Sequence, residues 1–387
     1  MKSEKISEFL QSRIEAKDFP SAVYLVAEKG EIVLHDALGF AVIEPEKIEA
    51  KIDTIYDLAS LTKPLITGLL CAKLIEQSEI KLTDKIAAYF SEFNTNEKCE
   101  TTIENLLLHN SGFVSWKAFY LITNYKSKIL NVIAFEPLAD AIGSMVLYSD
   151  LNFILLGLLL EKIHAKSLDE IIKEEIIKPL QLQNTLFNPP KRLRPQIAAS
   201  EFGNYFEREV CNELGYDLSM RDQRDYKMWN ELGYDAPSYG WRDYQIWGEV
   251  HDGNCYFMNG VSGHAGLFSN AFETFKIAQQ FLAEETILLK PETCKLFRTN
   301  FTKGLNEARS IAFQLAATKD STASDFLAKD SFGHLGFTGT SLWIEPQTER
   351  IFILLTNRTH ARELPFENIN SVRRKFHELA VKCLDGK

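Results

Sequence analysis

The sequence predicts an α+β fold in which an antiparallel sheet is built from both ends of the chain and flanked by helices, with an inserted helical subdomain. Two observations lead to this class. Strand-like runs of β-branched and aromatic residues occur at residues 21–41 and 338–357, and leucine-rich segments with helical spacing dominate residues 61–185. Segregation of strands from helices is typical of α+β proteins. We therefore expect a sheet domain from residues 1–62 and 270–387 and a mainly helical domain from residues 63–269.

The chain opens with a predicted helix that is followed by a hairpin. Apolar residues recur at Ile6, Phe9, Leu10 and Ile14, which is the spacing of one helix face. The next twenty residues read as two strands around the short turn Glu28-Lys29-Gly30, where the glycine is conformationally permissive. The N-terminal region is thus expected to supply one helix and two strands.

A second hairpin and a closing helix are expected at the other end of the chain. Residues 346–350 form a polar turn between two apolar runs, and residues 364–384 are predicted to be helical. Between the hairpins, the longest apolar run is "LNFILLGLLL" at residues 151–160. A membrane-spanning helix needs about 20 such residues, so no membrane span is predicted.

Composition excludes several classes of protein. The 387 residues carry a formal charge of -10, which argues against a general nucleic-acid or anionic-membrane surface. Six cysteines are scattered without any CxxC pair, so we expect buried free thiols rather than a zinc knuckle or a disulfide scaffold. The N-terminus lacks the continuous apolar segment of a secretory signal. As written, the sequence predicts a soluble cytoplasmic protein, or a periplasmic or secreted one if a leader is missing.

One tandem repeat interrupts the helical part. Residues 212–229 and 230–247 share ten of 18 positions. A period of 18 that occurs only twice is too short for a solenoid, so we interpret segment 212–247 as a local duplication that forms a surface insertion. Its Tyr, Trp and Asp residues leave a binding lid as the alternative.

A serine and a lysine share the start of one predicted helix. In "DLASLTKPLITGLL" at residues 57–70, Ser60 and Lys63 are one helical turn apart. Pro64 fits only the first turn of a helix, so Ser60 lies near a helix N-terminus, where partial positive charge accumulates. A serine hydroxyl becomes a nucleophile when a base takes its proton, and lysine is such a base once its pKa is depressed. A second SxxK at residues 78–81 lies in a polar connection and serves as an internal control.

Two later segments offer partners for this pair. Tyr148 is the only one of 13 tyrosines with Asn or Asp two positions later, namely Asp150. A tyrosine beside a lysine relays protons as a general base or acid. The alternative is that Asp150 caps the following helix while Tyr148 packs. His334 and Gly336 are expected to begin a strand beside the substrate, because glycine permits close approach. Another HxG, at residues 264–266, leads toward a helix and is less favoured.

In this order the motifs resemble the serine β-lactamase and penicillin-binding superfamily, specifically its class C β-lactamase-like branch with esterase and D-aminopeptidase relatives. The resemblance spans residues 5–380 outside the duplication and includes the segments "LLLHNSGF", "GEVHDGN" and "GHAGLFS". It implies a β-lactamase/transpeptidase-like fold. It also implies that Ser60 forms the acyl-enzyme and that Lys63 and Tyr148 share the proton transfers. The histidines of the first and third segments are expected to be structural.

On the substrate side, the resemblance implies that Asp150 takes the place of the usual asparagine and that His334 and Gly336 carry the strand motif. The backbone N–H groups of Ser60 and Phe337 would form the oxyanion hole. Classical members carry lysine at the first strand-motif position, whereas histidine is mostly neutral at pH 7. Asp150 is expected to raise the pKa of a nearby lysine and to repel an acidic substrate. Both departures disfavour efficient penicillin hydrolysis.

These features predict a hydrolase that acts through an acyl-enzyme on the ester, amide or β-lactam carbonyl of a small molecule or peptide, with weak β-lactamase activity. Two alternatives remain: a penicillin-binding-type protein that turns over poorly, and a noncatalytic interaction protein that uses the aromatic insertion. We expect no metal, because His251 and Asp252 lack a third clustered ligand, and no cofactor. The oligomeric state is not indicated. If His334 anchors a substrate carboxylate, preference for such substrates should rise as pH falls through about 6.5.

Overall fold

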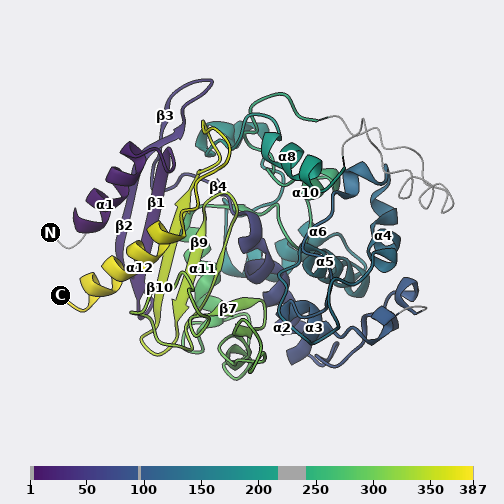
Figure 1. Cartoon of the computed structure of the whole chain (residues 1–387). Coiled ribbons are helices and arrows are strands. Elements are labelled where there is room, and N and C mark those ends of the chain that lie inside the picture. Colours follow the sequence, from purple (N-terminus) through teal and green to yellow (C-terminus); the bar gives the residue numbers. More distant parts are fainter. Residues whose placement is uncertain (1–3, 95–96, 217–240, 387) are drawn as a thin grey trace.

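The strand-like runs at the two ends of the chain pair with each other in one antiparallel sheet. The computed structural model describes residues 4–94, 97–216 and 241–386, so most of the duplicated segment lies outside the described residues. The sheet strands are β1 (Ser21–Glu28), β2 (Glu31–Val42), β3 (Ile48–Glu49), β6 (Arg309–Ser310), β7 (Phe313–Leu315), β8 (Phe332–Leu335), β9 (Ser341–Glu345) and β10 (Arg350–Thr356). Their spatial order is β3-β2-β1-β10-β9-β8-β7-β6 (Figure 1). The predicted α+β class, with a sheet built from both termini, is confirmed.

Helices cover both faces of this sheet. They are α1 (Glu4–Glu15), α2 (Leu69–Glu76), α3 (Ile103–Leu108), α4 (Ile129–Phe135), α5 (Asp150–His164), α6 (Leu168–Ile172), α7 (Lys178–Leu180), α8 (Tyr205–Glu213), α10 (Gly253–Phe257), α11 (Ala271–Ala278) and α12 (Asn370–Leu384). Helices α1 and α12, from opposite ends of the chain, contact each other on the outer face, and α11 lies against β1 and β10. The remaining helices form a separate layer beyond the inner face (Figure 1).

The central strands are buried on both faces, and their alternation feeds two cores. Leu25 of β1 is opposite Ile353 of β10, and both point into the core between the sheet and the helical layer. The next pair, Val26 and Phe352, points into the outer core beneath α1 and α12. This is the period-2 alternation of a strand, and here both sides are apolar because helices cover both.

The apolar run at residues 151–160 forms part of α5, which is buried in the helical layer. Among the described residues, no helix has the length and apolar character that crossing a bilayer requires. All six cysteines are free, and four of them are buried; Cys99 and Cys383 are partly exposed. The prediction of free thiols is therefore confirmed, and that of complete burial holds for four.

The first helix of the central region is less regular than its sequence suggests. Ser60 lies on a short 3-10 helix, Ala59–Leu61, and the chain then continues as a π-helix, Lys63–Gly68, before α2 begins. A Cβ on Gly68 would lie 2.5 Å from the Cβ of Ala312, so only glycine allows this segment to pack against the connection between β6 and β7. Ser60 is thus held at the start of a helical segment, as predicted.

The closing helix begins later than predicted. It starts at Asn370 rather than at residue 364. Pro365 disfavours helical backbone at the residue before it. The Asn368 side chain then accepts a hydrogen bond from the Asn370 N–H at 2.9 Å, a turn that competes with helix. The second hairpin, β9 and β10, turns where the sequence indicated.

Candidate active site

Lys63 brings three oxygens together around its ammonium group. Its Nζ lies 2.9 Å from Ser60 Oγ, 3.0 Å from the carbonyl oxygen of His264 and 2.7 Å from Asp150 Oδ1. Ser60 is close because it is one helical turn away, whereas Asp150 begins α5 and His264 lies in the loop before β5 (Phe268–Ser269). The lysine side chain is completely buried, while Ser60 is half-buried. An incoming molecule can therefore reach the serine but not the lysine.

The charge state of Lys63 is set by a competition. Burial acts to lower its pKa, but the charge of Asp150 and the contacts with Tyr148 outweigh burial, so the pKa is raised. The sequence predicted this effect of Asp150. At neutral pH the lysine is therefore an ammonium paired with a carboxylate, and it must lose a proton before it can take one from Ser60.

Tyr148 completes the group around Ser60. Burial raises the pKa of its phenol, and hydrogen bonds with Lys63 and Ser60 only partly oppose this, so the phenol holds its proton. The ring is fixed by neighbours: His109 stacks on it with centroids 4.4 Å apart, and the Lys63 Nζ lies 5.1 Å from its centroid. Sequence reasoning took His109 as structural, and its contacts fit that role.

Asp150 is the first residue of α5, not its cap. The N-cap is Ser149, whose hydroxyl donates to the carbonyl oxygen of Val114 at 2.6 Å. The capping alternative for Asp150 is therefore wrong. Its carboxylate is instead directed to Lys63, which makes it a partner of the proton network.

The strand motif differs from its prediction in position. His334 and Gly336 do not begin a strand: β8 ends at Leu335, and Gly336 follows it. A Cβ on Gly336 would lie 2.0 Å from Thr340 Oγ1 and 2.6 Å from the Leu58 carbonyl oxygen. The chain's own segment leading to Ser60 therefore requires glycine here, and Gly336 also lines a cavity that opens on Ser60.

His334 is a neutral ring in this site. Burial lowers its pKa well below 6.5, and the positive charges of Lys63 and Arg309 act in the same direction. Its Nδ1 donates to the Leu335 carbonyl oxygen at 2.9 Å, and its Nε2 has no hydrogen-bond partner among the described residues. The expectation that His334 becomes a cation near pH 6.5 is thus wrong.

A pH series tests this correction. A histidine with a depressed pKa gains its proton only well below the ordinary value. The ratio of kcat/KM for a carboxylate-bearing ester to that for its neutral analogue is therefore expected to stay flat between pH 8 and pH 6. A ratio that climbs as pH falls through 6.5 would restore His334 as the titrating anchor.

Sequence reasoning missed Arg309, a cation that takes a position near the strand motif. The residue starts β6, its side chain is only 5% exposed, and its guanidinium lies 5.6 Å from the Tyr148 ring centroid. Nε pairs with Glu307 Oε1 at 2.8 Å, whereas Nη1 has no hydrogen-bond partner among the described residues. The available signal was an arginine beside an apolar strand segment, which is too common to stand out.

Two cavities open on Ser60, and Tyr148, Phe206 and Phe337 line both of them. The first, with a volume of about 650 Å³, extends toward α8 and residues 251–252; we call it the carboxylate cavity. The second, of about 510 Å³, extends toward β6 and the start of α12; we call it the arginine cavity. A substrate carbonyl at Ser60 would have room on either side.

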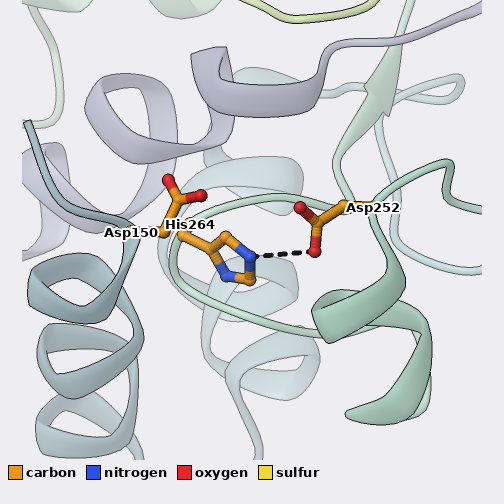
Figure 2. A group of neighbouring side chains, drawn as sticks. All are labelled: Asp150, Asp252 and His264. Atoms are coloured by element: carbon orange, nitrogen blue, oxygen red, sulfur yellow. Dashed lines mark hydrogen bonds and ion pairs between the residues drawn. The ribbon is translucent and has the colours of Figure 1, made fainter. Parts of the chain in front are cut away.

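Three side chains beside the lysine have the chemistry of metal ligands. The ligand atoms of Asp150, Asp252 and His264 lie within 4.8 Å of one another, and His264 Nε2 is 3.0 Å from Asp252 Oδ1 (Figure 2). Spacing in the sequence could not reveal this group, because its members come from three segments. The Lys63 ammonium already contacts Asp150. Burial acts to raise the pKa of Asp252, but the interaction with His264, helped by the Cys255 N–H and Lys63, outweighs burial, so the pKa is lowered. Because Asp150 already contacts Lys63 and Asp252 already accepts from His264, we assign the group no metal.

The chain is similar to known proteins along nearly its whole length. The family model described as Beta-lactamase matches residues 6–373. A protein of Escherichia coli (strain K12) named "Putative D-alanyl-D-alanine carboxypeptidase" is 30% identical over 369 residues, which cover 89% of this chain and 79% of that protein.

Two solved structures share the fold. One is titled "EstCE1, a hydrolase with promiscuous acyltransferase activity"; it has a TM-score of 0.70 and 18% identity, and the match covers 97% of this chain and 98% of that chain. The other is a class C beta lactamase from Rhodobacter sphaeroides, with a TM-score of 0.70, 14% identity, and coverage of 99% and 100%.

Proposed function

The chain belongs to the beta-lactamase family, a family of hydrolases, and from that premise we propose that it is a serine hydrolase that cleaves peptide-like amides or esters through an acyl-enzyme on Ser60. One observation carries the proposal: an accessible serine hydroxyl lies 2.9 Å from a buried lysine, at the point where two cavities meet. A nucleophile, a proton acceptor and room for both halves of a substrate are the parts that acyl transfer needs.

The protonation states of Lys63 and Tyr148 support a sequence of proton transfers for acylation. In the resting site Lys63 is an ammonium and Tyr148 a phenol. We propose that Lys63 passes a proton to Asp150, 2.7 Å away, and that the resulting amine takes the proton of Ser60 as Oγ bonds to the carbonyl carbon. Tyr148 then protonates the leaving group and regains its proton from Lys63.

Two backbone N–H groups, those of Ser60 and Phe337, are proposed to stabilise the oxyanion. Two hydrogen bonds connect their segments. Thr338 Oγ1 donates to the Asp57 carbonyl oxygen at 2.7 Å, and Thr340 Oγ1 donates to that of Leu58 at 3.0 Å. Such ties support the proposal, because an oxyanion hole works only when its donors are held in place before reaction.

Two lines of support lead to the proposed substrate class: the residues at which this chain departs from the classical family motifs, and the names of its relatives. Asp150 and a neutral His334 replace an amide and a permanent cation, which disfavours efficient β-lactam hydrolysis. The Escherichia coli relative is named for a carboxypeptidase that acts on D-alanyl-D-alanine, and a structural neighbour is titled a hydrolase with acyltransferase activity. We therefore propose a D-peptidase-like or esterase-like enzyme with weak β-lactamase activity.

Intact-mass measurement tests this function. After mixing with a fluorophosphonate, a penicillin and a small ester, the protein is expected to gain one adduct per reagent, located by peptide mapping on the peptide that contains Ser60. The ester adduct should decay as product appears. A permanent adduct without product would indicate a penicillin-binding-type protein instead, and absence of any adduct would indicate a noncatalytic one.

A further inference from the structure

The charges around Ser60 are divided between the two cavities. The carboxylate cavity is lined by four acidic side chains, and the arginine cavity by three guanidinium groups. The acidic residues are Glu136, Asp150, Glu207 and Asp252. The arginines are Arg309, Arg358 and Arg373. Among the described residues, no Lys or Arg lines the first cavity and no Asp or Glu lines the second. A substrate bound across Ser60 therefore meets opposite charges at its two ends.

In the arginine cavity, the available donor is Arg309. Arg373 is mostly engaged, because its Nη1 donates to Asn370 Oδ1 at 2.9 Å and its Nη2 to the carbonyl oxygens of Gly336 and Thr340 at 2.9 Å and 3.0 Å; only its Nε lacks a partner among the described residues. Nη1 of Arg309 is buried without an acceptor among the described residues. A buried donor that finds no acceptor within the protein is costly, and this points to an acceptor that arrives with the substrate. A carboxylate matches the guanidinium best.

In the carboxylate cavity, two of the four acids already have a cation. Glu136 pairs with Lys117, and Asp150 pairs with Lys63. The remaining acids, Glu207 and Asp252, have no Lys or Arg partner among the described residues.

Glu207 is held by neutral donors. Its Oε1 accepts from the Gly253 N–H and its Oε2 from the Tyr120 hydroxyl, both at 2.7 Å. Asp252 Oδ1 accepts from the Cys255 N–H at 2.7 Å and from His264 at 3.0 Å. Burial and the charge of Asp252 raise the pKa of Glu207 to about 7. His264 holds the pKa of Asp252 low, and His251 only partly offsets the effect of Asp252 on Glu207. The two acidic groups thus repel each other beside a cavity, which favours a further cation between the cavity and these side chains.

The cavity also has the walls and the position that an ammonium group needs. Trp116, Phe206 and Tyr216 line it, and aromatic faces attract ammonium groups and cover alkyl chains. Asp252 and Asp150 have carboxylate oxygens within 4.8 Å of each other (Figure 2). Asp150 in turn contacts Lys63, which contacts Ser60. The ammonium would therefore lie within about one residue of the carbonyl under attack.

We propose that the substrate is dipolar: it carries an ammonium group in its acyl part, bound beside Asp252 and Glu207, and a carboxylate in its leaving group, bound at Arg309. This inference rests on the proposed function, because it takes Ser60 as the point of attack. A short peptide with a free amino terminus and a free carboxyl terminus has this distribution of charge. A peptide whose amino group is acylated lacks half of it.

Protection of Ser60 from fluorophosphonate labelling measures binding of each peptide, whether or not it is cleaved. D-Ala-D-Ala is compared at pH 7.5 with N-acetyl-D-Ala-D-Ala and with D-Ala-D-Ala amide, and release of D-alanine is followed in parallel. We expect D-Ala-D-Ala to protect at concentrations at least tenfold lower than either blocked peptide.

Variants assign the preference to each cavity. Asp252→Asn and Glu207→Gln should reduce the preference for the free amine at least fivefold, and Arg309→Met should do the same for the free carboxylate. Glu136→Gln is the matched control, since Glu136 lines the same cavity but already pairs with Lys117; it should leave the amine preference within twofold.

The failures are distinguishable. No labelling of Ser60 would overturn the proposed function itself. Normal labelling with equal or stronger protection by N-acetyl-D-Ala-D-Ala, or with no protection by any of the three peptides at 10 mM, would overturn the dipolar substrate while leaving the hydrolase intact.

Discussion

Ser60→Ala is expected to reduce kcat by about 10⁶-fold, the order of magnitude found when a serine nucleophile is removed from a hydrolase, and to abolish covalent labelling. The physical reason is local: the change removes the oxygen that lies 2.9 Å from Lys63 Nζ. Lys63 keeps its contacts with Asp150 and the His264 carbonyl, so the fold should survive. Steady-state kinetics with an ester and circular dichroism measure the two effects separately.

Ser78→Ala is the matched control, because residues 78–81 repeat the SxxK spacing. Ser78 and Lys81 are both exposed, so no buried lysine is available to activate this serine. Activity and labelling should equal those of the unchanged protein. If the Ser60 and Ser78 variants label equally well, Ser60 is not the nucleophile.

Lys63→Met is expected to lower both activity and stability. Activity should fall at least about 10³-fold, because no group then accepts the proton of Ser60. The free energy of unfolding should fall by about 3 kcal/mol, the lower end for a broken buried ion pair, since Asp150 keeps 16% of its side chain exposed. Kinetics with an ester and urea unfolding monitored by fluorescence give the two numbers.

The double variant Lys63→Met with Asp150→Asn separates the two effects. Removing the carboxylate as well removes the unpaired charge, so most of the lost stability should return while activity stays low. Lys85→Met is an exposed control that breaks the pair with Glu100 and should leave the unfolding midpoint unchanged. A double variant as unstable as the single one would show that the loss came from packing rather than from the charge on Asp150.

The contrast between the two SxxK copies explains what sequence reasoning can and cannot separate. Both have the same spacing, and the surrounding composition alone favoured the first. The structure adds the decisive difference, because Lys63 is fully buried beside Asp150 and Lys81 is exposed. Burial of a lysine depends on which distant segments pack over it, and spacing within one helix carries no such information.

Packing of distant segments also explains why the sequence did not reveal the charged residues that line the substrate cavities. Arg309 and Glu207 belong to no motif, since each lies in a segment whose local pattern is ordinary, and Asp252 was noted only within the segment "GEVHDGN" and as a possible metal ligand. They line the two cavities only because β6, α8 and the loop before α10 converge on Ser60. The lowered pKa of His334 was likewise beyond local inference, because it arises first from burial by distant segments and then from the charges of Lys63 and Arg309 on other elements.

The sequence by itself determined the fold class, both hairpins and the start of the Ser60 helical segment. It also singled out Tyr148 by the aspartate two positions later. Strand alternation, turn residues and helix spacing act over a few neighbouring residues, which is why the sequence shows them. The sequence predicted that Asp150 raises the pKa of a nearby lysine, but only the tertiary structure decided how completely Lys63 is buried, the neutral state of His334 and the separation of acidic from basic walls around Ser60. Those properties arise from desolvation and from charges on segments far apart in the chain, and such distances in space exist only once the chain has folded.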